Sequence, residues 1–130
     1  MVSRDTRAHV VALLIAVVVL VVLSELVVLP ETEFVTVSFL LLFYGLVLGG
    51  AHAYLALRGY NGLVSVEARL RYLAMLAILL VTGGLIFLAG TETIFGMELG
   101  TIGFAIIVVT VIGYLVGESL DAYRESREEA

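Results

Sequence analysis

Long apolar stretches alternate with short polar segments along this chain of 130 residues. Four apolar stretches run over 8–29, 34–57, 72–90 and 99–117. Each is close to the ~20 residues that a helix needs to cross a hydrocarbon layer roughly 30 Å thick. The apolar residues are continuous rather than alternating, which is typical of helices and not of the strands of a membrane β-barrel. We therefore predict four transmembrane helices, because a helix satisfies its own backbone polar groups within lipid.

Short polar linkers over 30–33, 58–71 and 91–98 join the four stretches. Short links bring successive helices side by side and in opposite directions. The chain is therefore predicted to be an all-α membrane protein with one domain, an antiparallel up-down four-helix transmembrane bundle. Residues 118–130, which follow the last apolar stretch, are predicted to form an acidic cytoplasmic tail.

The two halves of the chain share short motifs, which indicate a duplicated two-helix hairpin. The outer linkers read Glu-Thr-Glu-Phe from Glu31 and Glu-Thr-Ile-Phe from Glu92. The helices that follow end in His-Ala-Tyr from His52 and Asp-Ala-Tyr from Asp121. The alternative is a chance likeness between two apolar halves of low complexity.

Composition excludes several classes of function. Hydrophobic residues make up 62% of the chain and charged residues 15%, whereas a soluble domain is nearer half apolar and a quarter charged. A soluble globular enzyme is therefore excluded. The absence of cysteine excludes disulfides, thiolate metal sites and cysteine nucleophiles. The first apolar stretch is longer than the core of a secretory signal peptide, and no small-x-small cleavage site precedes Pro30, so we expect it to be retained.

The basic residues of this chain are seven arginines, and they fall in three segments. These segments are the N-terminal segment, the middle linker and the C-terminal tail, and they hold Arg4, Arg7, Arg58, Arg69, Arg71, Arg124 and Arg127. With four spans, the three segments share one side of the membrane, and the other two linkers carry glutamates and no base. Because cytoplasmic segments carry the excess of arginine and lysine, we predict a cell-membrane protein with both termini in the cytoplasm.

A second interpretation of three of these arginines, Arg58, Arg69 and Arg71, is that they bind lipid phosphates or a protein partner. Nucleic-acid binding is not expected, because the net charge of the chain is −5 and its polar segments are short. The expected surroundings of the chain are the lipid bilayer and other membrane helices.

Glycine spacing predicts where helices approach closely. Lipid is as apolar as leucine, so membrane helices associate through close backbone contact and a few polar contacts. Gly45 and Gly49 lie four residues apart in the second stretch, and Gly113 and Gly117 lie four apart in the fourth. Gly45, Gly49 and His52 share one helix face. We predict that these glycines pack helices, either inside the bundle or at the interface of a homo-oligomer or a larger membrane partner.

A few polar side chains interrupt the apolar stretches, and these are the candidates for function. Glu25 lies five residues before Pro30, so it is either solvated by headgroups or is a cation or proton site. His52 either makes one hydrogen bond to a neighbouring helix, or relays protons or binds a cofactor. Tyr44 and Tyr114 lie deeper and need hydrogen-bond partners.

Two histidines can in principle bind haem, and the only partner for His52 is His9. His9 lies at the cytoplasmic end of the first helix, so within one chain the two rings can approach only near that edge. The sequence offers no catalytic triad, no nucleotide-binding glycine motif and no set of metal ligands on rigid elements. We therefore predict that the chain is not an enzyme and has no cofactor or metal.

Residues 49–59, which read GGAHAYLALRG, and residues 67–74, which read EARLRYLA, resemble uncharacterised small four-helix membrane proteins of halophilic archaea. The resemblance extends to the lysine-free, acidic composition, and it implies a four-helix membrane protein without a known activity. In size the chain is also similar to the small multidrug resistance transporters. Those carry a glutamate in the middle of the first helix and usually a membrane tryptophan, whereas Glu25 lies near the helix end and tryptophan is absent.

The sequence thus predicts a non-catalytic polytopic membrane protein, acting as a structural, accessory or partner-binding subunit. One alternative is a small dimeric transporter of ions or solutes that uses Glu25 and His52. Another is the membrane-anchor subunit of a redox enzyme.

Overall fold

Four long helices and one short hairpin make up the described part of the chain. The computed structural model describes residues 1–26 and 30–130. The elements are α1 (Arg4–Leu26), α2 (Glu33–Leu57), α3 (Val66–Ala89), β1 (Thr93–Ile94), β2 (Met97–Glu98) and α4 (Leu99–Glu128). Each of the four helices is long and apolar enough to cross a membrane. The end of the first predicted span, 27–29, lies outside the described residues.

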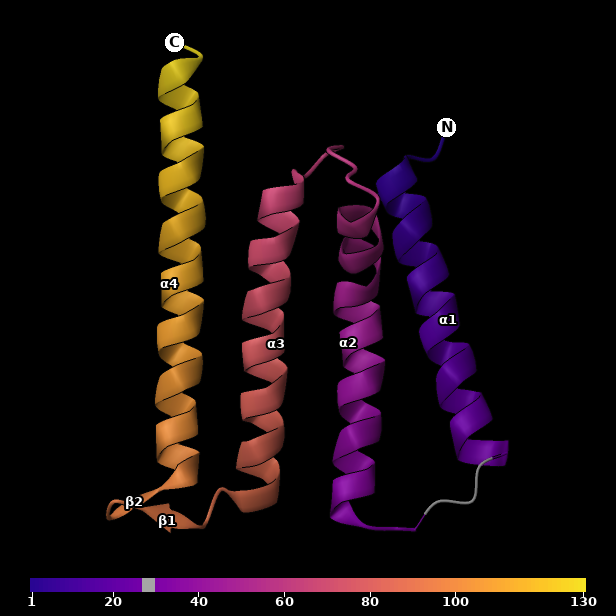
Figure 1. Cartoon of the computed structure of the whole chain (residues 1–130), viewed down its shortest axis with the longest axis vertical. Helices are drawn as coiled ribbons and strands as arrows, with labels where there is room; N and C mark the ends of the chain where they lie inside the picture. The colour runs from indigo at the N-terminus through magenta and orange to yellow at the C-terminus, as the bar shows by residue number, and fades with distance from the viewer. Residues whose placement is uncertain (27–29) are drawn as a thin grey trace.

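The four helices stand in one row, and each runs opposite to the one before it (Figure 1). Substantial contacts join α1 to α2, α2 to α3 and α3 to α4, while α1 and α4 lie at opposite ends of the row. Antiparallel neighbours are what the short linkers predicted. Closure of the row into a four-helix bundle, which needs α1 to meet α4, does not occur within this single chain. The chain is an open layer, one helix thick.

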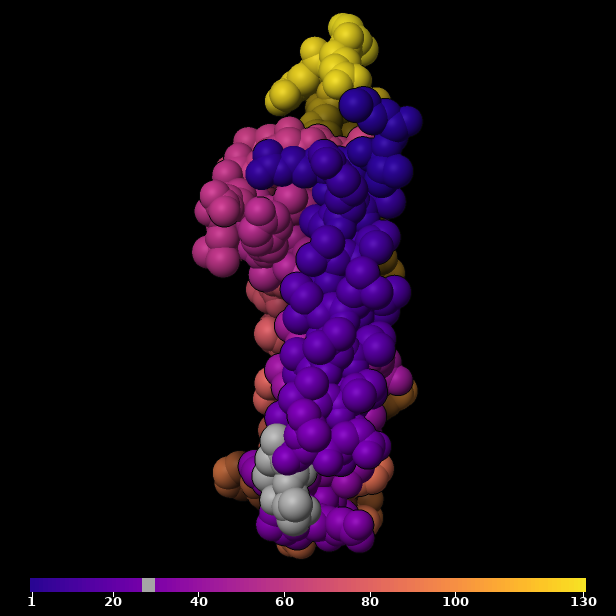
Figure 2. Space-filling model, turned by 90° about the vertical axis from the view of Figure 1, so that its right-hand side faces the viewer, coloured from indigo at the N-terminus to yellow at the C-terminus, as the bar shows by residue number. Residues whose placement is uncertain are grey.

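The two ends of the layer differ in chemistry. The N-terminus, the linker between α2 and α3, and the C-terminal part of α4 share one end (Figures 1 and 2). All seven arginines lie in these segments or in the helix turns that adjoin them, and we call this end the arginine end. The hairpin and the segment before α2 lie at the opposite end. The sequence-based grouping of the polar segments on two sides therefore agrees with the helix directions.

Polar side chains cap the starts of α2 and α3, and α3 begins at Val66, six residues before its predicted apolar stretch. The Thr32 hydroxyl accepts a hydrogen bond from the Val35 amide and caps α2. The Ser65 hydroxyl accepts one from the Ala68 amide at 3.2 Å and caps α3. Asn61 supports the same helix start, because its Oδ1 accepts a bond from the Val66 amide at 2.8 Å. These caps use donors that the first turn of a helix leaves free.

The linker before α4 is a tight hairpin rather than an open loop. Residues Phe95 and Gly96 join β1 to β2, with φ angles of 52° and 76°. Positive φ at both central residues is the mark of a two-residue turn whose twist matches the strands. Glycine adopts this conformation freely, and an aromatic side chain at Phe95 does so under strain.

The last helix extends well beyond its predicted span. The apolar stretch ends at 117, but α4 continues to Glu128. The predicted tail over 118–130 is therefore helical for most of its length, and its charged side chains lie on a rod that projects from the arginine end. Helix α1 likewise begins at Arg4, four residues before its apolar stretch.

Glycines allow close contact at the α2–α3 and α3–α4 interfaces. A Cβ at Gly49 would lie 2.9 Å from Leu76 of α3, and one at Gly84 would lie 3.2 Å from Val37 of α2. At Gly103 of α4 the added Cβ would lie 2.6 Å from Ile86 of α3. Gly49 therefore lies at the contact between α2 and α3, and Gly45 also faces α3, with more room.

Most apolar side chains remain uncovered in this layer. At most 17% of the residues in the apolar window of any helix are buried, because each helix has neighbours on two sides at most. Ala16 and Leu55 are among the few fully buried core residues. Apolar surface on this scale is far larger than the patches that soluble monomers expose. Both broad faces of the layer therefore require apolar surroundings.

The two halves of the chain differ where the duplication predicts likeness. Glu31-Thr32-Glu33-Phe34 leads into a capped helix start, with Thr32 as the cap. The corresponding Glu92-Thr93-Ile94-Phe95 instead enters a strand and a hairpin turn. The local structure therefore gives the duplication no support.

Candidate functional site

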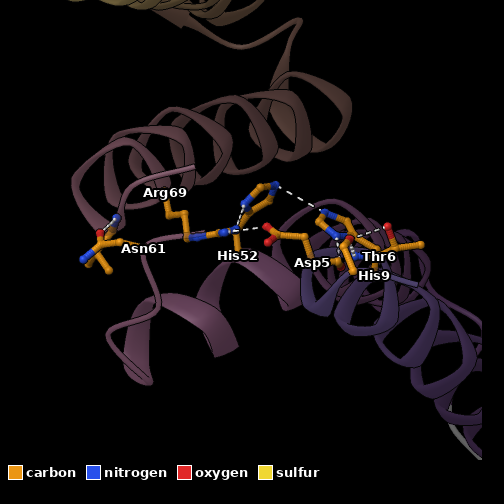
Figure 3. Close-up of polar contacts among 8 residues, drawn as sticks. Asp5, Thr6, His9, His52, Asn61 and Arg69 are labelled. Atoms are coloured by element: carbon orange, nitrogen blue, oxygen red, sulfur yellow. Dashed lines mark hydrogen bonds and ion pairs between the residues drawn. The ribbon is translucent and has the colours of Figure 1, made fainter. Parts of the chain in front are cut away.

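Four polar side chains from three helices meet at the arginine end. Asp5 and His9 come from α1, His52 from α2 and Arg69 from α3 (Figure 3). We call these four residues the polar cluster. Asp5 and His9 are four residues apart, so they share one face of α1. The cluster is the place where three helices are joined by side-chain hydrogen bonds.

A buried ion pair forms the centre of the polar cluster. Arg69 Nη2 donates to Asp5 Oδ1 at 2.5 Å, and the two side chains are 0% and 9% exposed. Desolvating two charges is costly, and their attraction offsets that cost only when the geometry is good. Removing either partner leaves the other charge buried without compensation. The pair therefore fixes α1 against α3 across the end of α2.

The hydrogen bonds of the cluster form a closed circuit whose proton positions follow from the partners. Arg69 Nη1 lies 3.1 Å from His52 Nδ1, and a guanidinium has only donors, so this nitrogen accepts. The proton of the neutral His52 ring is then on Nε2, which lies 3.4 Å from His9 Nε2. His9 Nδ1 carries the other proton and donates to the Asp5 carbonyl oxygen at 2.8 Å. The circuit begins and ends on Asp5.

The linker between α2 and α3 folds over the ion pair. A Cβ at Gly62 would lie 2.7 Å from Asp5 Oδ2 and 2.3 Å from the Tyr60 ring. Glycine is therefore required at 62 for the backbone to pass this close. The Arg4 guanidinium in turn lies over the Tyr60 ring, with its Cζ 4.4 Å from the ring centre. The linker and the first turn of α1 thus shield Asp5 from solvent.

The carboxyl group of Asp5 is held in its charged form. Asp5 lies in the first turn of α1, before the apolar stretch that begins at Ala8. The hydrogen bond from Arg69 lowers the pKa of Asp5 below its ordinary value of 3.8, and burial opposes this shift without cancelling it. Negative charge at a helix N-terminus is also favoured by the helix dipole.

A second set of ion pairs joins α3 to α4. Arg71 Nε lies 2.7 Å from Glu118 Oε1, and Arg71 Nη2 lies 3.1 Å from Asp121 Oδ2. All three side chains are between 31% and 42% exposed, so water screens these pairs and weakens them. Together with the polar cluster they connect all four helices at the arginine end.

The predicted functional residues do not come together in one site. Glu25 is exposed near the C-terminal end of α1, whereas His52 is at the arginine end. Sixteen residues separate Glu25 from His9, the neighbour of His52, which corresponds to about 24 Å along a helix. Tyr44 is exposed and Tyr114 is half-buried. Among the described residues neither hydroxyl is hydrogen-bonded. The tyrosine that bonds to a neighbouring helix is instead Tyr72, whose hydroxyl donates to the Leu48 carbonyl at 3.0 Å.

Sequence reasoning missed Asp5 and predicted for Arg69 either a topological role or the binding of lipid phosphates or a partner, not a buried ion pair. Arg69 is fully buried, whereas Arg4, Arg7, Arg58, Arg71, Arg124 and Arg127 are exposed. One signal that pointed to the pair was present. Asp5 is the only carboxylate in the N-terminal segment, and it stands four residues before His9, the pairing expected of a polar helix face.

The histidine pair lies where the sequence predicted that it could form, near the edge of the layer. Its hydrogen bonds do not suit a metal or haem iron. A histidine ligand offers an unprotonated ring nitrogen, whereas in His52 Nδ1 accepts from Arg69 and Nε2 carries the proton. Within residues 1–26 and 30–130, no group of three or more His, Cys, Asp or Glu side chains is arranged to hold a metal ion.

Comparison of the chain with family models, curated proteins and solved structures finds no match. The resemblance to small membrane proteins of halophilic archaea therefore stays a prediction. Function has to be argued from the geometry of this chain alone.

Proposed function

We propose that this chain is a multi-pass protein of the cell membrane that acts as a non-catalytic, partner-binding subunit, with α4 as its docking helix. The observation that carries the proposal is the open edge of the layer. Helix α4 packs against α3 on one side, and within its apolar window only 6% of the residues are buried.

Two glycines on α4 have no packing role within the chain. A Cβ at Gly113 or Gly117 would meet nothing within 4 Å among the described residues. An exposed glycine inside a helix destabilises it by about 1 kcal/mol relative to alanine. The pair Gly113 and Gly117 has the small-xxx-small spacing that lets a second membrane helix approach closely. A helix of another membrane protein, or of a second copy, fits that requirement.

The proposed orientation places the arginine end in the cytoplasm. It is supported by the seven arginines that this end carries and by the absence of basic residues from the opposite linkers. The polar cluster then lies at the cytoplasmic interface, where it fixes the helix ends. We assign it a structural role, because its side chains bond to one another and join three helices, although Asp5 Oδ2 and Arg69 Nε are buried without a hydrogen-bond partner among the described residues.

The two alternatives gain no support from the geometry. A transporter that uses Glu25 and His52 together requires them in one pathway. They lie at opposite ends of the layer, because each is near the C-terminal end of its helix and α1 and α2 are antiparallel. A redox anchor that uses the two histidines requires free ring nitrogens, and Arg69 occupies one of them.

Cross-linking from single cysteines tests the docking role of α4, because the chain contains no cysteine. Gly113→Cys is the probe and Leu115→Cys is the matched control. Leu115 is also exposed, at 57%, but it lies about 200° round the helix from Gly113. Both variants are cross-linked in native membranes with a short bifunctional thiol reagent.

The expected result is a discrete larger adduct from Gly113→Cys and none from Leu115→Cys. An adduct of twice the mass identifies a second copy as the partner, and any other discrete mass identifies a different protein. The proposal requires in addition that Gly113→Leu abolishes co-purification of that partner. Monomer alone from both cysteine variants, or equal adducts from both, would refute docking through this face.

A further inference from the structure

A groove at the arginine end runs along the surface where α1 packs against α2. Its volume is about 580 Å³, within the ~300–1,000 Å³ range of small-molecule sites. Several of the side chains that line it are small, and the two helices come close together at its floor. A Cβ at Gly50 would lie only 3.4 Å from the Cβ of Ala12, and Ala8 and Ala51 continue the small lining towards the helix ends.

The groove is apolar along its length and cationic at its mouth. Ile15 and Leu46 line the part nearer the middle of the layer, and Arg4 and Arg7 line the part at the arginine end. Tyr54 lies on the α2 side of the mouth. A ligand that follows the groove therefore needs an apolar tail and an anionic head, in the order that a lipid has within one leaflet.

The two arginines at the mouth are free to bind an anion. Among residues 1–26 and 30–130, the ion pairs use Arg69 and Arg71, so neither Arg4 nor Arg7 is paired with a carboxylate. Asp5 stands between them in sequence, but its carboxylate is taken up by Arg69. Arg4 and Arg7 are three residues apart, which places them on one side of α1.

Stacking orders one of these guanidinium groups without using its donors. Arg4 lies over the face of the Tyr60 ring at 4.4 Å, and this contact leaves the in-plane N–H groups exposed. A planar guanidinium with free N–H groups matches two oxygens of a phosphate. The positive end of the α1 dipole adds to the attraction for an anion at this position.

We propose that one anionic phospholipid binds in this groove, with its phosphate between Arg4 and Arg7 and an acyl chain along Ala12 and Ile15. Basic pockets between membrane helices on the cytoplasmic side are suited to anionic lipid headgroups. The proposal rests on the membrane setting and orientation proposed above. The lipid fills the groove that small side chains leave open, and it holds α1 against α2 at the level of the headgroups.

Lipid retention by the purified full chain tests this site. The protein is exchanged into detergent micelles that contain either phosphatidylglycerol or phosphatidylcholine, and bound lipid is counted by native mass spectrometry. We expect the unmodified chain to retain one phosphatidylglycerol in preference to phosphatidylcholine. The double variant Arg4→Gln/Arg7→Gln should lose that preference by about tenfold or more, because charge-assisted bonds to the phosphate are removed.

Matched variants separate the groove from general charge. Arg124→Gln/Arg127→Gln removes the same charge from the far end of α4 and should leave retention unchanged. Ala8→Leu keeps every arginine but fills the groove, and it should lower retention as well. Equal retention by the unmodified chain and Arg4→Gln/Arg7→Gln would refute the site, and so would an equal loss in Arg124→Gln/Arg127→Gln.

The same preparations distinguish failure of this site from failure of the proposed function. A chain that stays in the membrane fraction and cross-links through Gly113→Cys, yet shows no lipid preference, refutes the lipid site alone. A chain recovered in the soluble fraction refutes the membrane setting on which both proposals depend. Circular dichroism of each variant checks that the helices remain folded.

Discussion

Arg69 donates to Asp5 across 64 positions of sequence, and the guanidinium that does so is wholly buried. The bond joins the first turn of α1 to the first turn of α3, and the Gly62 backbone closes over it. Because α2 stands between these two helices in the row, the ion pair makes three helices into one unit. The ion pairs that the described residues form between helices all lie at this end.

A double-mutant cycle measures how much the Asp5–Arg69 ion pair contributes to the free energy of unfolding. Arg69→Met leaves the Asp5 carboxylate buried and unpaired, and we expect it to lower the free energy of unfolding by about 3 kcal/mol or more. Asp5→Asn removes the opposite charge and should also be strongly destabilising. The double variant Asp5→Asn/Arg69→Met should recover part of the loss, because no buried charge remains.

The measurement is thermal or denaturant unfolding in detergent, followed by circular dichroism. Arg71→Met serves as the control, because it removes an arginine from partly exposed pairs with Glu118 and Asp121. Its effect should be clearly smaller than that of Arg69→Met. Equal losses at the two arginines would show that burial does not set the strength of the Asp5–Arg69 pair.

The hydrogen-bond circuit predicts one tautomer for each histidine. The His52 ring should carry its proton on Nε2, because Arg69 can only donate to Nδ1. The His9 ring should carry its proton on Nδ1, because the Asp5 carbonyl can only accept. Nitrogen NMR of the two imidazole rings distinguishes these forms near neutral pH. Two rings with the same tautomer would contradict the circuit, and Arg69→Met should release His52 from the predicted form.

Stability should depend on pH through Asp5. The pKa of this carboxyl group is lowered in the folded chain by the Arg69 hydrogen bond, so the unfolded chain binds its proton first. The stabilisation is therefore complete above the ordinary value of 3.8 and is lost as the pH falls through the lowered value. The midpoint of thermal unfolding, measured from neutral to strongly acidic pH, should decrease as the pH drops below that ordinary value. The fall should be smaller in Asp5→Asn, and an identical profile in that variant would assign it to other carboxylates.

The number and direction of the helices follow from the sequence because both depend on local chemistry. Twenty apolar residues make a span, and a polar linker ends it. Thr32 and Ser65, at the two helix starts, are residues that commonly cap helices. The continuation of α4 to Glu128 was not predicted, because a charged helix outside the apolar stretch has the same composition as a solvated tail.

The rotation of each helix about its own axis could not be predicted. A helix that is apolar all round has no polar face to fix its orientation, and so no pattern indicated that Arg69 points towards α1. The same reason explains the different environments of two glycines on one helix. Gly103 lies against Ile86, while Gly113 lies against nothing among the described residues. Spacing predicted packing at Gly113, but it does not show whether the neighbour belongs to this chain or to a partner.

Alanine at these two glycines should therefore have opposite effects. Gly103→Ala introduces a Cβ 2.6 Å from Ile86 and 3.3 Å from Thr82, so α3 and α4 must move apart. We expect this variant to lower the free energy of unfolding by about 1–3 kcal/mol, as overpacked interfaces do. Gly113→Ala meets no atom and should instead stabilise the isolated chain by up to about 1 kcal/mol, through helix propensity. Unfolding of the two variants in the same detergent measures both effects.

Recovery of the partner with the same two variants is a second measurement. It distinguishes packing within the chain from packing against a partner. Gly113→Ala places a methyl group on the face proposed to receive another helix, so partner recovery should fall although the chain itself is more stable. Gly103→Ala should weaken the chain and affect recovery only in proportion to the folded fraction. If Gly113→Ala raised stability and left recovery intact, this face of α4 would not be the docking surface. The open edge of the layer would then have to be covered through its other side, where Leu115 lies.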